Sequence, residues 1–106
     1  MNFDINNTIN DMLGAIKGTV SDNWENVKET AMQFLQNEKE RLEMIAQLRI
    51  SGDLNQEDFE SRLKDSQKVM EAELAALAVL SKAIIQKAAN AAIDVLAKAV
   101  KAAIPI

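Results

Sequence analysis

The residues that come closest to a metal-binding loop are Asp53, Asn55 and Glu57. They stand at alternate positions, as the first three calcium ligands of an EF-hand loop do. That loop also needs a glycine at its sixth position and a glutamate at its twelfth, and these positions hold Asp58 and Lys64. Because both the sharp turn and the closing carboxylate are missing, the sequence predicts no metal site.

The other residues that could do chemistry are carboxylates, lysines and hydroxyls. The chain has no Cys and no His, which removes thiolate nucleophiles, imidazole bases and the Glu-x-x-His ligands of di-iron bundles. The mid-chain glutamates read as a solvated helix face: Glu38, Glu40, Glu43, Glu71 and Glu73. No Ser or Lys stands in a Gly-rich loop that would aim it at a substrate. The chain is therefore predicted not to be an enzyme, with no catalytic residue, cofactor or small-molecule substrate.

Composition indicates one folded domain over residues 1–106. Apolar residues make up 48% and charged residues 26%, which is ordinary for a globular protein. The net charge of −4 is unevenly spread, with −6 over residues 21–73 and +3 over 74–106. The basic part has no Arg and no aromatic residue, so nucleic acid is not an expected partner. The first residues lack a secretory signal, which makes a cytoplasmic location the default and leaves non-classical export open.

Apolar residues at helical spacing define a first arm. Ile5, Ile9, Met12 and Ile16 recur every three or four positions, and the pattern resumes after Ser21. We expect a helix over 4–20 that continues over 22–50, with a kink or short break near 18–22 where Asp22 would cap the second part.

A turn is predicted in the middle of the chain. Gly52 suits the left-handed position that ends a helix, and Asn55 is a favoured N-cap for the next one. Leu54 and Phe59 take the two positions of a hydrophobic staple. Short connections of this kind make the two helices antiparallel neighbours.

The segment 42–66 resembles the short C-terminal (SHOCT) domain, a small helical hairpin. The matching residues are Leu42, Ile45, Leu48, Gly52, Leu54, Asn55, Glu57, Asp58, Phe59, Glu60 and Leu63. Here the motif lies in mid-chain and covers about a quarter of it, whereas the family places it at the C-terminus. The resemblance implies oligomerisation or partner binding without catalysis.

The second arm is predicted to be one uninterrupted helix over 55–104, ending before Pro105. Fifty residues give a rod of about 75 Å, which matches the first arm. The expected fold class is therefore all-α, a long antiparallel hairpin with both termini far from the Gly52 turn. Such a hairpin would be packed into an oligomeric helical bundle.

The last part of the second arm is very apolar. Residues 74–104 hold 23 apolar residues, 12 of them Ala, and the polar side chains occupy one arc of the helix. One antiparallel partner cannot bury so much apolar surface. The first interpretation is a helix at the centre of a bundle, and the alternative is a helix lying in a lipid interface. A transmembrane span is not expected, because Lys87, Asp94 and Lys98 interrupt it.

The favoured function is that of a non-catalytic, self-associating interaction or assembly protein, a homo-oligomer. The alternative is a membrane-active or lipid-surface-binding protein, for example a pore-forming one, with membrane lipid as its partner. The candidate interface residues are Ile5, Ile9, Met12, Ile16, Leu77, Leu80, Ile84, Ile85, Ile93, Val95, Leu96 and Val100.

Overall fold

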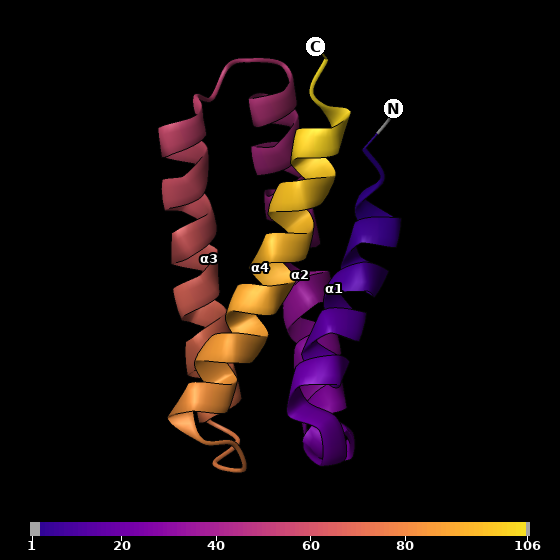
Figure 1. The fold of residues 1–106 in the computed structure, drawn as a ribbon, viewed down its shortest axis with the longest axis vertical. Helices are drawn as coiled ribbons and strands as arrows, with labels where there is room; N and C mark the ends of the chain where they lie inside the picture. Colours follow the sequence, from indigo (N-terminus) through magenta and orange to yellow (C-terminus); the bar gives the residue numbers. More distant parts are fainter. Residues whose placement is uncertain (1–2, 106) are drawn as a thin grey trace.

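The protein is all-α and forms an up-down-up-down bundle of four helices (Figure 1). A computed structural model describes residues 3–105, and no strand occurs among them. A three-residue 3-10 turn, Ser21–Asn23, joins the first two helices. The α-helices are α1 (Ile5–Val20), α2 (Trp24–Ile50), α3 (Gln56–Ala75) and α4 (Lys82–Ala103).

Helix α1 begins and ends with clear local signals. The Asp4 carboxylate accepts hydrogen bonds from the backbone N–H groups of Asn6 and Asn7, at 2.9 and 3.2 Å. The expected apolar face is buried over the whole length of the helix. At the other end Ser21 takes a positive φ of 50° and the chain reverses. The break expected near 18–22 is therefore confirmed, but it is a full reversal rather than a kink, because the two apolar faces bury each other only when α2 folds back.

The start of α2 differs from the prediction in one detail. Asp22 lies inside the 3-10 turn and does not cap the helix. The N-cap is Asn23, and its side chain makes no capping hydrogen bond. Because Ser21 turns the chain one residue before Asp22, the helix begins later than its capping signal indicated.

The turn between α2 and α3 follows the sequence prediction closely. Gly52 has φ 88°, and the Leu54 N–H donates to the Leu48 carbonyl at 3.0 Å. The Asn55 side chain accepts from the Asp58 N–H at 2.8 Å. Leu54 and Phe59 are both buried in the core. Residue types alone therefore fix where α2 ends and α3 begins.

We expect Gly52→Val to lower the free energy of unfolding by about 1 kcal/mol or more, because a β-branched residue pays heavily for positive φ. A Cβ at this position would meet no neighbouring atom within 4 Å, so backbone strain alone is responsible. Urea denaturation measures the loss. Gly14→Val is the control, since Gly14 also faces open space but lies inside α1 at ordinary helical φ.

The prediction of a single helix over 55–104 is wrong. The chain leaves α3 after Ala75, turns through residues 76–81 and enters α4 at Lys82. The Ser81 hydroxyl caps α4 by accepting from the Ile84 N–H at 3.2 Å. Ala78 makes the reversal possible by adopting φ 57°. The physical reason is burial: folding back lets α4 cover its apolar stripe within its own chain, which a rod of about 75 Å cannot do.

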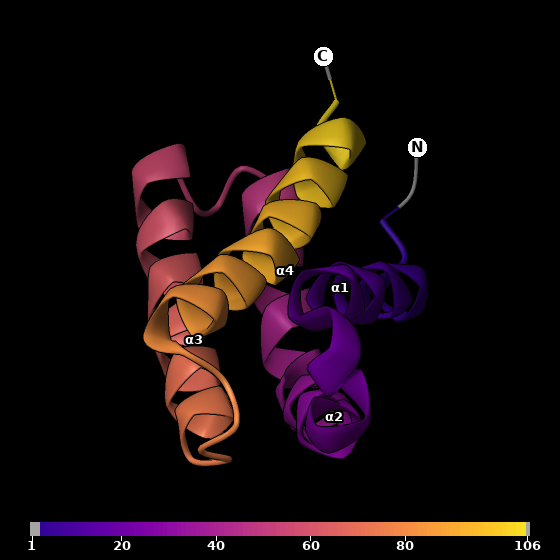
Figure 2. The same cartoon turned by 60° about the horizontal axis from the view of Figure 1, so that its bottom comes forward.

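Helix α4 lies between α1 and α3 (Figure 2). Its contact with α1 is the most extensive in the bundle, and it also touches α2. Ala88, Ala89 and Ala92 have no exposed surface, so small side chains let the neighbouring helices come close. The expectation of an Ala-rich helix surrounded by several neighbours holds, and the neighbours come from the same chain.

The overall shape also differs from the expected hairpin. The principal extents are 41 × 22 × 20 Å, far shorter than a 75 Å rod. The start of α1 and the end of α4 lie at the same end of the bundle as the Gly52 turn (Figure 1). The termini were expected at the opposite end. Two additional reversals, at residues 21–23 and 76–81, account for the difference.

Candidate functional site

The expected interface residues lie mostly inside the bundle. Eight of them are buried: Ile5, Ile9, Met12, Ile16, Ile85, Ile93, Leu96 and Val100. The other four are half-buried against the same core: Leu77, Leu80, Ile84 and Val95. These apolar residues, which were the basis for expecting a second copy, are thus covered by other parts of the same chain.

The connection between α3 and α4 is the most unusual surface feature. Residues 76–80 read Ala-Leu-Ala-Val-Leu, with no polar side chain. Val79 is 43% exposed, and Leu77 and Leu80 are half-buried. We call residues 75–80, at the end of the bundle opposite the Gly52 turn, the apolar tip (Figure 1). Connecting loops are usually polar, so an apolar one marks a candidate contact surface.

The backbone of the apolar tip is held in an unfavourable conformation. Ala78 has φ 57°, in the left-handed region that non-glycine residues rarely adopt. The turn is closed by two backbone hydrogen bonds, from the Leu77 N–H to the Leu74 carbonyl at 3.3 Å and from the Ala78 N–H to the Ala75 carbonyl at 3.1 Å. The Gly52 turn reaches positive φ with a glycine and without this cost.

The seam between α3 and α4 is hollowed along its length. Near the apolar tip, Ala72 and Ala75 of α3 and Ile85 of α4 line an open hollow of about 530 Å³. In mid-seam, Leu63 and Ile93 line another of about 490 Å³. Together with the extensive α1–α4 contact, these hollows show that α4 packs less closely on α3 than on α1.

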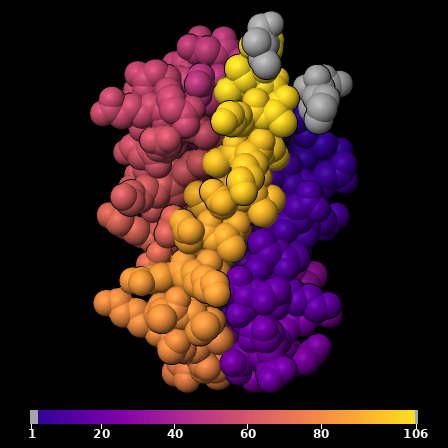
Figure 3. Space-filling view, viewed as in Figure 1, coloured from indigo at the N-terminus to yellow at the C-terminus, as the bar shows by residue number. Residues whose placement is uncertain are grey.

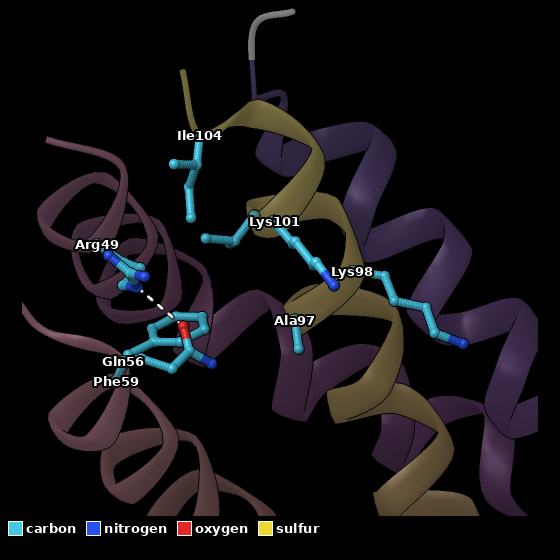
Figure 4. Close-up of a pocket in the computed structure, with 8 residues that line it drawn as sticks. Arg49, Gln56, Phe59, Ala97, Lys98, Lys101 and Ile104 are labelled. Carbon is cyan, nitrogen blue, oxygen red and sulfur yellow. Dashed lines mark hydrogen bonds between the residues drawn. The ribbon is translucent and has the colours of Figure 1, made fainter. Parts of the chain in front are cut away.

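A third hollow, of about 480 Å³, lies at the opposite end of the seam (Figure 4). Phe59, Val100 and Ile104 supply apolar walls. The Arg49 Nε donates to the Gln56 Oε1 at 3.0 Å on one side. Lys98 extends away from the hollow (Figure 4). Its Nζ pairs with the Asp94 Oδ2 at 3.4 Å. The cations therefore do not converge on one point, and the hollow lacks the geometry of an anion site.

Sequence reasoning did not find this hollow. Its walls come from α2, α3 and α4, and Arg49 and Ile104 are far apart in the chain. No local spacing signals such a site, because it depends on how the helices cross.

Two of the residues that resemble EF-hand calcium ligands, Asp53 and Asn55, stabilise the turn between α2 and α3 instead. The Asp53 carboxylate accepts from the Ser51 hydroxyl at 2.9 Å, and the Asn55 side chain caps α3. Within residues 3–105 no three acidic side chains gather closely enough to hold a metal ion. Over the same residues, no helix has the length and hydropathy needed to span a membrane.

Charge is divided between the two helices that flank the seam. Helix α4 exposes Lys82, Lys87, Lys98 and Lys101 with one acid, Asp94, and forms a ridge between α3 and α1 (Figure 3). Helix α3 carries six acidic and three basic residues. Outside the seam, the Arg41 Nη1 donates to the buried Ser66 hydroxyl at 2.7 Å and ties α2 to α3.

These features define an all-α four-helix bundle with an apolar tip. Comparison of the chain with protein-family models, curated proteins and solved structures gave no match.

Proposed function

We propose that this protein is a non-catalytic assembly protein that associates with further copies of itself through its apolar tip. The observation that carries the proposal is the apolar composition of the α3–α4 turn, in which Val79 is exposed and Leu77 and Leu80 are half-buried. Apolar surface exposed at a loop is stabilised when a partner covers it. The resemblance of residues 42–66 to a SHOCT hairpin would imply the same class of function.

Charge around the apolar tip favours a second copy over a lipid surface. Glu71 and Glu73 precede the tip on α3, and Lys82 follows it on α4. Two copies meeting tip to tip in antiparallel orientation bring the acidic side of one to the basic side of the other. An anionic lipid surface would attract Lys82 but repel both glutamates.

Sedimentation at micromolar concentration should therefore show a dimer or larger species. We expect Val79→Ser to raise the dissociation constant about tenfold, because each copy loses apolar area at the contact. Val69→Ser is the matched control, since Val69 on α3 is equally exposed, at 45%, and lies away from the tip. A folded monomer that does not self-associate, or equal effects of the two variants, would refute the proposal.

The alternative function, binding to a lipid surface, is favoured by the four exposed lysines along α4, of which Lys82 lies beside the apolar tip. Flotation with phosphatidylserine vesicles tests it. Salt-sensitive binding that is lost when Lys98 and Lys101 are neutralised, with the oligomer mass unchanged, would establish membrane action instead. Absence of binding at low salt would leave self-association as the function.

A further inference from the structure

We infer that two copies associate by exchanging α4. In the exchanged dimer the turn at residues 76–81 straightens, one helix runs from Gln56 to Ala103, and each α4 packs on the α1, α2 and α3 of the second copy. The inference rests on the proposed self-association and specifies its geometry. Three independent observations support it: the composition of the turn, its backbone strain, and the charges on either side of it.

The composition of the turn favours a helix. The segment Ala-Leu-Ala-Val-Leu-Ser contains no Gly, Pro or Asn, and Ala and Leu are among the strongest helix formers. The Ser81 hydroxyl is the only capping side chain of the turn, through its bond to the Ile84 N–H. By local preference alone the segment belongs to a continuous helix, which is what the sequence pattern predicts for 55–104.

Straightening the turn removes a conformational cost. Ala78 at φ 57° would return to ordinary helical φ, and residues 76–81 would gain the hydrogen bonds of a regular helix. A hinge whose closed form is strained is the usual starting point for exchange of an element between copies. The Gly52 turn has no such strain, because glycine tolerates its φ of 88°; the first turn has a comparable one at Ser21, φ 50°, but lacks the helix-favouring composition of residues 76–80.

The exchange leaves the buried surface of the core almost unchanged. Buried residues of α4 such as Ile85, Leu96 and Val100 keep the same neighbours, supplied by the second copy. The buried area of the bundles is therefore nearly equal in the two forms. The conformational energy of residues 76–81 then determines the equilibrium between the closed monomer and the exchanged dimer. The candidate interface deduced from the apolar pattern of the sequence would then lie between two chains.

The exchanged arrangement also covers the apolar tip. A helix over residues 56–103 is about 72 Å long, so it extends well beyond a bundle of 41 Å and reaches the second copy past the tip. In a twofold dimer the two long helices pass each other in antiparallel orientation at Ala78. Val79 of each copy then lies near Leu77 of the second copy, and Glu73 of each lies near Lys82 of the second copy.

The first test changes the strain. Ala78→Gly relieves the backbone strain of the turn and lowers the stability of the long helix, because glycine tolerates positive φ and is a poor helix former. We therefore expect the dimer dissociation constant, measured by sedimentation equilibrium, to rise at least about tenfold. Ala72→Gly is the matched control, because Ala72 is also exposed but is helical in both forms; its dissociation constant should stay within about twofold of the wild type. Equal dissociation constants for Ala78→Gly and the wild type would overturn the exchange.

The second test locates α4 in the dimer. Lys101 lines the same hollow as Phe59, so a spin label on Lys101→Cys broadens the Phe59 amide signal of whichever chain holds that α4. Spin-labelled chain is refolded together with ¹⁵N-labelled, unmodified chain, and the ¹⁵N spectrum is recorded. Broadening at Phe59 in the mixed dimer supports the exchange.

The two proposals fail in different ways. A protein that is monomeric throughout refutes both self-association and exchange. A dimer without broadening at Phe59 refutes the exchange and leaves contact through the closed apolar tip as the mode of association.

Discussion

Replacement of Leu96 by glutamate is expected to unfold the protein. Leu96 has no exposed surface and lies on the buried face of α4. The variant loses the burial of a leucine, about 2 kcal/mol, and places a carboxylate among apolar groups without a partner, which costs several kcal/mol more. A domain of this size has only about 5–15 kcal/mol of stability in total.

Circular dichroism during heating measures the effect, and the cooperative transition of the wild type should be absent or strongly lowered in temperature. Asn90→Glu is the control, because Asn90 lies on the exposed side of the same helix. Its unfolding should stay within about 0.5 kcal/mol of the wild type. A cooperative Leu96→Glu protein with an unchanged midpoint would show that α4 does not pack through this face.

Phe59→Ala is expected to cost about 3–5 kcal/mol in the free energy of unfolding, the usual range for truncating a buried aromatic ring. Phe59 is 2% exposed, joins the core at the start of α3 and forms a wall of the hollow shown in Figure 4. Because that hollow is already open, the truncation widens an existing opening rather than leaving a closed cavity, which brings the cost toward the lower end of the range.

Urea denaturation of the two proteins gives the difference. Phe3→Ala is the matched control, since Phe3 packs against the core only in part. It removes the same atoms from a half-exposed site and should cost clearly less. Equal losses for the two variants would mean that Phe59 is not a core residue.

The sequence predicts those parts of the fold where residue types leave one local solution. At residues 51–59 a glycine, an N-cap and a staple all favour the same turn, and the structure contains it. At residues 76–81 the alanines and leucines favour a helix, and the turn forms only because burial of α4 outweighs local preference. Tertiary packing of this kind has no signature in a short window of sequence.

The candidate interface illustrates a second limit. Helical spacing correctly selected Ile9, Met12 and Leu96 as buried residues. Periodicity reports which face of a helix is covered and says nothing about which chain covers it. The hollow beside Phe59 is beyond sequence reasoning for a related reason, because its walls are brought together by the crossing of three helices.

The extensive contact between α1 and α4 bears on the order of events during synthesis. Helix α1 is made first, yet its main partner is the last helix of the bundle to leave the ribosome. Until then the apolar face of α1 has only α2 to cover it, and the chain must close a long loop before the core is complete. A bundle with this connectivity should fold more slowly than one in which successive helices are the closest neighbours. Until α4 has been synthesised, the exposed apolar face of α1 makes the chain prone to aggregation.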